Sequence, residues 1–208
     1  MIEHANRSAA SHHVAQHLAQ KLSEALCEPG EAALVLSGGS TPVQTIKKLA
    51  TQDLDWARVV ITLTDERCVP ADHPDSNTAM VLGLLAGTPA SGARFVNPNG
   101  ADGRTFPRPA ASLVGMGADG HFASLFPDAE NLAAAMALST TQRWVEVSTA
   151  ASPHARVSQT LAALIDTNHL ILLAFGDDKR ALLMEPGELP VAALLRQTET
   201  PVDVHWAP

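Results

Sequence analysis

The sequence holds little that would form covalent cross-links or enter a membrane. Its 208 residues include only two cysteines, Cys27 and Cys68, which lie far apart and belong to no Cys-x-x-Cys or Cys/His motif. This argues against a disulfide scaffold or a cysteine-based zinc site and fits the reducing cytoplasm. Since no apolar run approaches the ~20 residues of a membrane span, we expect neither a membrane anchor nor a signal peptide.

Clusters of positive charge are missing as well. The chain has 14 Lys and Arg against 22 Asp and Glu, a net charge of −8, and no basic block. Nucleic-acid backbones require an extended positive surface, so we expect no nucleic-acid partner. A phosphorylated metabolite is not excluded, because a few cations and backbone N–H groups can converge locally on one small anion.

What is present is typical of one mixed α/β domain over residues 1–208. Short apolar runs predict buried parallel strands, and apolar residues at helical spacing predict helices. The expected strands cover residues 32–36, 59–63, 110–114, 144–147, 170–175 and 202–206. The expected helices cover 9–26, the segment after Pro42, the segment from a Ser76 or Asn77 cap through Leu85, 129–138, 157–165 and 190–195. Gly87 to Pro109 is expected to be an irregular connection.

Three histidines, His12, His13 and His17, fall together in the first expected helix. They could suggest a metal ligand set, but no carboxylate partner lies nearby in the sequence. We therefore expect them to face solvent.

Polar clusters follow three of the expected strands directly. Ser37-Gly38-Gly39-Ser40-Thr41-Pro42 follows the first, Thr64-Asp65-Glu66-Arg67 the second, and Gly176-Asp177-Asp178-Lys179 the strand at 170–175. In open α/β sheets, ligands bind beyond the carboxyl ends of parallel strands, so these clusters predict a binding edge. The alternatives are a helix merely capped by Ser40 or Thr41 and a solvated turn at Asp65 to Arg67.

The segment from Gly115 to Asp128 carries the strongest chemical signal. Gly115 to Gly120 fits G-x-G-x-x-G, but Pro127 shortens any helix behind it and the next expected strand lacks an acidic residue at its end, which disfavours a dinucleotide site. His121 is embedded in this loop, and imidazole, with a reference pKa of about 6.5, can accept a proton at neutral pH. We interpret His121 as a general base, with Asp65 or Asp119 holding its tautomer or orienting a water; an inert capping histidine is the alternative.

Three cations are expected at the same edge. Arg156 would lie in the first turn of the helix over 157–165, where the helix dipole disfavours a cation, so its position suggests that it binds an anion. The alternative is an ordinary surface arginine. With Arg67, Lys179 and the Gly38-Gly39 turn it could hold a phosphate. The residues alone thus predict a site for a phosphorylated small molecule with a histidine base.

Three segments closely resemble the glucosamine-6-phosphate isomerase/6-phosphogluconolactonase family, and within it the lactonases. They are Leu36 to Pro42, Thr64 to Pro70 with Ser76-Asn77, and Gly115 to Asp128, and the similarity continues through Pro153, Arg156 and Gly176 to Lys179. The resemblance implies a three-layer α/β/α fold with a mostly parallel, Rossmann-like sheet. It also implies hydrolysis of 6-phosphogluconolactone in the pentose phosphate pathway without metal or organic cofactor. Separately, we expect a cytoplasmic protein that is a monomer or weak homodimer.

The resemblance assigns roles position by position. His121 corresponds to the base that activates water, Asp65 to a supporting group and Arg67 to a substrate-contacting arginine. The phosphate-binding pattern is matched by Gly39, Ser40, Thr41, Arg156 and Lys179, and we place Gly38, Gly117, Asp119 and Gly120 with them as substrate-binding residues. Whether Arg67 or backbone N–H groups would stabilise the oxyanion stays open at this point.

Two alternatives remain beside the lactonase. The isomerases and deaminases share the Asp-Gly-His triplet but resemble a sequence with a Glu near an Asn before the proline, whereas this chain has Ala123-Ser124-Leu125-Phe126-Pro127. The second alternative is a phosphosugar-binding sensor without activity. It is suggested by the short 87–109 connection and by Ala110-Ala111, where the family commonly has a longer connection and an Asp.

Overall fold

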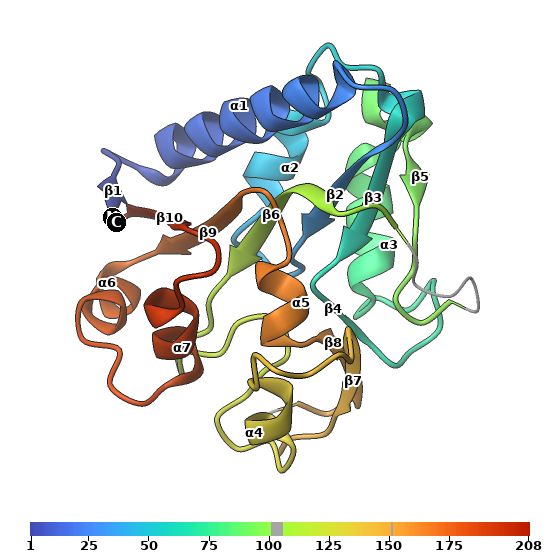
Figure 1. Ribbon diagram of the computed structural model, residues 1–208. Coiled ribbons are helices and arrows are strands. Elements are labelled where there is room, and N and C mark those ends of the chain that lie inside the picture. The colour runs from blue at the N-terminus through green and yellow to red at the C-terminus, as the bar shows by residue number, and fades with distance from the viewer. Residues whose placement is uncertain (101–105, 151) are drawn as a thin grey trace.

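A computed structural model of the chain, describing residues 1–100, 106–150 and 152–208, is built around one parallel sheet (Figure 1). Seven strands lie in the order β1-β10-β9-β6-β2-β3-β5, and every neighbouring pair is parallel. Their bounds are Ile2–Glu3 (β1), Ala32–Leu36 (β2), Val59–Leu63 (β3), Arg94–Phe95 (β5), Pro109–Gly115 (β6), Leu170–Phe175 (β9) and Val202–Ala207 (β10). The predicted mostly parallel sheet is confirmed.

The central strands are continuous apolar runs because both of their faces are covered. In β9, Ile171 and Leu173 point into one core while Leu170 and Leu172 point into the other. The first core lies under α1 (Arg7–Leu26), α2 (Val43–Leu49) and α3 (Asn77–Leu85), and the second under α4 (Leu132–Ala135), α5 (Leu161–Ile165) and α7 (Pro190–Arg196). Figure 1 shows these helices on opposite sides of the sheet, which is the expected three-layer arrangement. The helix α6 (Asp177–Met184) follows β9 directly.

A second, three-stranded antiparallel sheet was not anticipated from the sequence. It joins β4 (Asp65–Arg67), β8 (Arg156–Gln159) and β7 (Trp144–Val147) in that order. The prediction that Arg156 opens a helix was therefore wrong, and so was the helix-dipole argument built on it. The reason is local: the side chain of Thr160 accepts a hydrogen bond from the backbone N–H of Ala163, so the helix starts only at Leu161.

Two other expectations need correction. The helix predicted over 129–138 is only the short α4, and Asp128 does not cap it but accepts a hydrogen bond of 2.6 Å from the Thr149 hydroxyl. The connection expected to be irregular contains a short 3-10 helix at Pro89–Gly92, the strand β5 and the first residue of β6; its residues 101–105 lie outside the described part. By contrast, the predicted Ser76 cap of α3 is confirmed, since its side chain accepts from the N–H of Ala79.

The histidines of α1 only partly face solvent. His12 and His13 are exposed, but His17 is half-buried, and the rings of His13 and His17 lie 5.3 and 6.5 Å from the ring of His205 in β10. Among the described residues, no helix combines the length and apolar character needed to cross a membrane.

Candidate active site

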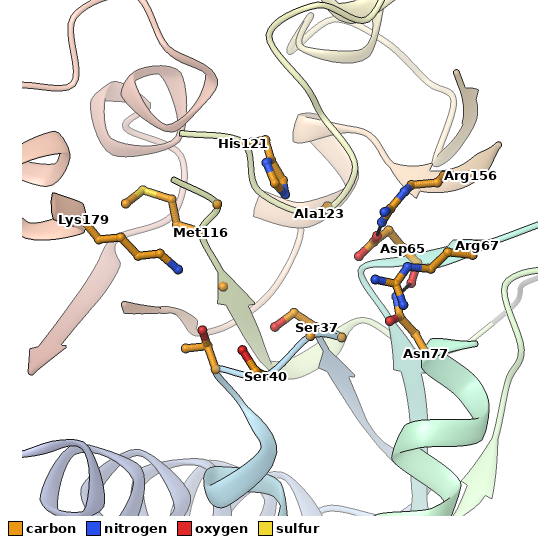
Figure 2. Close-up of a pocket in the computed structure, with 15 residues that line it drawn as sticks. Ser37, Ser40, Asp65, Arg67, Asn77, Met116, His121, Ala123, Arg156 and Lys179 are labelled. Atoms are coloured by element: carbon orange, nitrogen blue, oxygen red, sulfur yellow. Dashed lines mark hydrogen bonds and ion pairs between the residues drawn. The ribbon is translucent and has the colours of Figure 1, made fainter. Parts of the chain in front are cut away.

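A cavity of about 200 Å³ opens where the carboxyl ends of β2, β3, β6 and β9 meet (Figure 2). Because the strands are parallel and adjacent, the loops that leave them converge there. The cavity is lined by Ser37, Gly38, Gly39, Ser40, Thr41, Asp65, Arg67, Asn77, Gly115, Met116, Gly117, His121, Ala123, Arg156 and Lys179. Every residue predicted for the site is therefore brought to it except Asp119 and Gly120.

Those two exceptions lie just behind the cavity wall. Asp119 contacts His121, as described below. Gly120 packs against Leu189, and its carbonyl accepts a hydrogen bond of 3.0 Å from the backbone N–H of Val191 at the start of α7. Gly120 thus anchors the histidine loop to a helix, and nothing in this geometry gives it a substrate contact.

The loop after β6 holds His121 firmly at the cavity wall. The Nδ1 atom of His121 lies 2.5 Å from Oδ1 of Asp119, and its ring packs on Phe126 with centroids 4.2 Å apart. A carboxylate can only accept, so Nδ1 carries the proton and Nε2 is left with a lone pair. Of the two carboxylates considered from the sequence, Asp119 is the one that fixes the tautomer.

The charge of Asp119 supports this pairing. Partial burial pushes the pKa of Asp119 upward, but its interactions with His121, first of all the side-chain hydrogen bond, outweigh burial, so the pKa ends below its ordinary value. Asp119 therefore stays ionised at neutral pH and can stabilise a positive charge that forms on His121.

Asp65 occupies a different part of the cavity. It is only 4% exposed, and its carboxylate accepts hydrogen bonds from the hydroxyls of Thr64 at 2.8 Å and Ser124 at 2.6 Å. Arg156 approaches the same carboxylate at 3.5 Å. Within the described residues no hydrogen bond joins Asp65 to His121. Its role toward His121 therefore stays a prediction that requires a bridging water or substrate.

Two of the cations face each other across the small sheet. Arg67 and Arg156 are direct cross-strand partners of β4 and β8. Like charges in directly opposed positions repel, so this pair destabilises the sheet unless a nearby anion compensates the two charges. Burial lowers the pKa of Arg156, which the Asp65 carboxylate partly offsets, and its guanidinium lies over the Phe126 ring at 5.2 Å. The charges of Asp65 and Glu66 favour the charged form of Arg156, whereas the charge of Arg67 opposes it.

The third cation, Lys179, lies across the cavity from these arginines (Figure 2). It is half-buried on α6, and burial together with the charge of Arg7 lowers its pKa. Ser40 lies below it in Figure 2, and Thr41 also lines the cavity. The helix α2 has no side-chain cap hydrogen bond, so the predicted capping role of these hydroxyls was wrong. Both hydroxyls are available to a ligand.

Several residues of the site were missed by sequence reasoning. Asn77 donates from Nδ2 to the backbone carbonyl of Asp65 at 3.0 Å, and Ser37 and Met116 also line the cavity. Buried Oγ of Ser37, Oδ1 of Asn77 and Nε of Arg67 have no partner in the described part of the chain. Unsatisfied buried polar atoms are costly, which marks this wall as one built for a polar ligand. The Ser76-Asn77 pair was noted in the sequence as a helix cap and as part of the family resemblance, but not as part of the site.

Glu66 lies beneath the cavity and organises this wall. Its buried carboxylate accepts hydrogen bonds from the backbone N–H groups of Arg67, Asn77 and Thr78 at 2.7, 2.8 and 2.6 Å. It also accepts from the hydroxyl of Ser76 at 3.1 Å. One side chain thereby ties β4 to the first turn of α3.

Glycine is required at two points of the wall by close approach. A Cβ on Gly117 would lie 2.3 Å from Nδ1 of His121, and one on Gly38 would lie 2.0 Å from Oδ1 of Asn77. Both distances are far below van der Waals contact. The glycines of the two motifs thus let side chains pack directly on the backbone.

Comparison with known proteins adds to this geometry. The family described as Glucosamine-6-phosphate isomerases/6-phosphogluconolactonase matches residues 5–111 and 90–206, and so nearly the whole chain. The chain belongs to this family.

Relatives within the family are similar over most of their length. The 6-phosphogluconolactonase of Pseudomonas putida is 36% identical over 214 residues, covering 94% of this chain and 87% of that protein. A 6-phosphogluconolactonase of Neisseria meningitidis is 37% identical over 226 residues, covering 99% and 97%. The crystal structure of a 6-phosphogluconolactonase from Shewanella baltica superposes with a TM-score of 0.92 at 32% identity, covering 100% of this chain and 97% of that one.

Proposed function

We propose that this chain hydrolyses 6-phosphogluconolactone to 6-phosphogluconate, the reaction of its similarly folded relatives within the oxidative pentose phosphate pathway. The observation that carries the proposal is the Asp119–His121 pair, which presents an unprotonated Nε2 at a cavity that also holds Arg67, Arg156 and Lys179. A base and an anion site in one cavity suit a phosphorylated ester. They do not by themselves suit a simple binding protein.

In the proposed reaction, Nε2 of His121 takes a proton from a water as that water attacks the lactone carbonyl carbon. Asp119 stabilises the imidazolium that forms, as an ionised carboxylate does in a catalytic triad. The carbonyl π electrons move to the oxygen, and collapse of this oxyanion breaks the bond to the ring oxygen. That oxygen then receives the proton from His121, which restores the base. Arg67 and Arg156, facing each other across β4 and β8, are the charged candidates for stabilising the oxyanion.

The phosphate is assigned to the side of the cavity bounded by Lys179 and the Gly38 to Thr41 turn. The free hydroxyls of Ser40 and Thr41 and the Lys179 ammonium offer donors there. A phosphate has several acceptor oxygens and gains most from such charge-assisted hydrogen bonds.

A lactonase assay tests the proposal. Purified protein should open 6-phosphogluconolactone faster than buffer, and His121→Ala should remove most of that excess while His12→Ala, which changes an exposed histidine of α1, should not. If wild-type protein matches the spontaneous rate but still binds the lactone, the sensor alternative replaces the enzyme. Formation of fructose 6-phosphate from glucosamine 6-phosphate in a coupled assay would favour the isomerase instead.

We also propose that the protein acts in the cytoplasm, as a monomer or weak homodimer and without a cofactor in the reaction. The oxidative pentose phosphate pathway, from which the substrate comes, supports the location. Size-exclusion chromatography with light scattering tests the assembly: a mass near 21.9 kDa that rises only at high concentration is expected. A constant dimer mass on dilution contradicts the prediction.

A further inference from the structure

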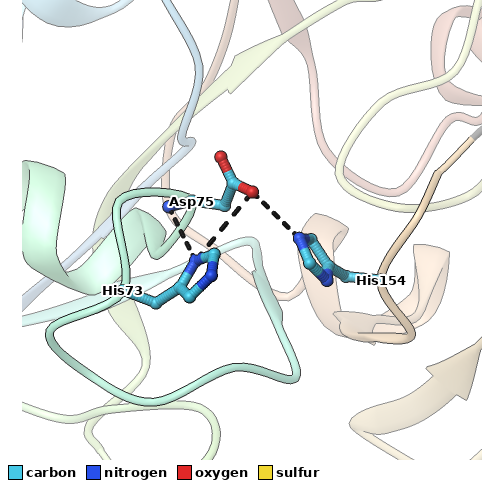
Figure 3. A group of neighbouring side chains, drawn as sticks. All are labelled: His73, Asp75 and His154. Atoms are coloured by element: carbon cyan, nitrogen blue, oxygen red, sulfur yellow. Dashed lines mark hydrogen bonds and ion pairs between the residues drawn. The ribbon is translucent and has the colours of Figure 1, made fainter.

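A compact group of potential metal ligands lies beside the candidate active site and takes no part in the proposed reaction. His73, Asp75 and His154 each place one ligand atom within 4.8 Å of the others (Figure 3). His73 and Asp75 come from the loop between β4 and α3, and His154 comes from the segment just before β8. We propose that these three side chains bind a divalent transition-metal ion of the zinc type.

The distances fit such an ion. Nε2 of His154 lies 2.9 Å and Nδ1 of His73 lies 3.9 Å from Oδ2 of Asp75. Donors that surround Zn²⁺ tetrahedrally at ~2.0–2.1 Å are about 3.4 Å apart. One of the two observed distances is shorter than this ligand–ligand distance and the other is longer. Small side-chain rotations bring all three atoms onto one ion.

The hydrogen bonds of this group show which atoms an ion would bind. Nδ1 of His73 accepts the backbone N–H of Asp75 at 3.1 Å, so this nitrogen carries a lone pair and no proton. Nε2 of His154 donates to Oδ2 of Asp75 at 2.9 Å. A bound ion would replace both hydrogen bonds, and His154 would lose its Nε2 proton, as metal ligands generally do.

The backbone around the three ligands is fixed in advance. Pro74 restricts the chain between His73 and Asp75, and the carbonyl of Asp75 accepts a hydrogen bond of 2.7 Å from Nη1 of Arg67. The carbonyl of Ala155, next to His154, accepts the N–H of Cys68 at 2.8 Å. Preorganised ligands lose little conformational entropy on binding, which favours affinity.

The donor set selects the class of ion. Two imidazoles and one carboxylate suit Zn²⁺, Co²⁺ or Ni²⁺, whereas Mg²⁺ and Ca²⁺ prefer oxygen ligands alone. The side chains of His73 and His154 are 35% and 28% exposed, so water can complete the coordination. The bound ion would join the loop that contacts Arg67 to the segment that leads into Arg156, and would thereby stiffen one rim of the cavity.

The test is titration of metal-stripped protein with ZnCl₂, followed by calorimetry and by thermal unfolding. Wild-type protein is expected to bind with a saturable heat and to unfold at a higher temperature when Zn²⁺ is present. Both effects should disappear in His154→Ala and in His73→Ala, and MgCl₂ should produce neither. Unchanged unfolding of the variants without metal shows that they fold.

A second histidine group provides the matched control. The rings of His4, His13 and His205 also lie close together, with centroids 5.2 to 5.3 Å apart, but among the described residues only His73, Asp75 and His154 bring three ligand atoms together. His13→Ala should therefore retain the heat and the stabilisation. Loss of both in His13→Ala with retention in His154→Ala, or no saturable binding in wild type, overturns the proposal. Since none of these readouts is activity, their failure is distinct from failure of the lactonase assay.

Discussion

His121 owes its position to side chains and backbone on both sides of its ring. Asp119 fixes its tautomer, Phe126 supports one face, and Gly117 leaves room for the ring against the backbone. The local sequence from Gly117 to Phe126 therefore contains nearly everything that orients the proposed base. Tests at the scale of single residues follow from these contacts.

Gly117→Ala should reduce turnover without unfolding the protein. The added Cβ would lie 2.2 Å from Cε1 of His121, so the imidazole must swing away. A misplacement of about 1 Å can cost about 100-fold in rate, and we expect a loss of that order in kcat. Gly83→Ala is the matched control, since a Cβ there meets nothing within 4 Å. Full activity in Gly117→Ala would contradict the placement of His121.

Lys179→Ala should distinguish phosphate binding from lactone chemistry. Loss of one charge-assisted hydrogen bond, at about 1.5–3 kcal/mol, predicts a KM for the phosphorylated lactone about 10- to 100-fold higher. The KM for gluconolactone without phosphate should barely change, and Lys47→Ala, which alters an exposed lysine of α2, should affect neither. Equal effects on both lactones would remove Lys179 from the phosphate role. Arg156→Ala is less selective because Arg156 also contacts Asp65.

At the scale of elements, the small antiparallel sheet and α3 form one wall of the cavity. The cross-strand register of β4 and β8 sets Arg67 opposite Arg156, and Glu66 joins β4 to α3 through hydrogen bonds to the backbone of Asn77 and Thr78. The wall therefore depends on a carboxylate that faces away from the substrate. Removal of this carboxylate should therefore lower the stability of the folded protein.

Glu66→Gln should destabilise the protein by about 2–4 kcal/mol. The new amide nitrogen would face backbone N–H groups that now donate to a carboxylate oxygen, which leaves buried donors unpaired. Urea unfolding measures the change. Glu31→Gln serves as control, because Glu31 forms an exposed ion pair with Arg94 and such pairs contribute little to stability. Similar stability of the two variants would contradict the role of Glu66.

At the scale of the whole molecule, β1, α1 and β10 bring distant histidines together. His205 in β10 is fully buried, with its Nδ1 3.0 Å from Nε2 of His4, and its Nε2 has no partner among the described residues. The pKa of His205 is lowered to about 4, chiefly by burial and then by the neighbouring histidines His4, His13 and His17. The charge of Asp203 opposes this shift in part. The folded protein thus holds His205 neutral.

This burial predicts a loss of stability in mild acid. The unfolded chain protonates His205 near pH 6.5, whereas the folded chain does so only near its pKa of about 4. The unfolded state therefore binds more protons in this window, and stability should fall as the pH drops, by about 2 kcal/mol between pH 7 and 5. Denaturant unfolding at several pH values measures this slope. His205→Leu should flatten it, while His12→Gln, at an exposed position, should leave it unchanged; an unaltered slope in His205→Leu would refute the assignment.

Much of the fold and of the cavity could be predicted from the chain alone. The strands at 32–36, 59–63 and 170–175 have the predicted bounds, because runs with both faces buried are apolar throughout and end where polar residues begin. Arg156 was predicted at the right cavity but on the wrong element, since the periodicity of Val157 and Leu161 spans the end of a strand and the start of a helix. Asn77 and Ser37 were missed because their roles depend on what packs against them.

The sequence by itself determined the parallel sheet, the order of the site motifs along the chain and the loop that holds His121. Each depends on local propensity or on contacts between residues a few positions apart. Only the tertiary structure decided that Asp65 accepts from Ser124 instead of pairing with His121, that Arg67 faces Arg156, and that His73 and Asp75 meet His154. Those contacts depend on strand register and on packing between segments far apart in the chain, and no local pattern encodes either.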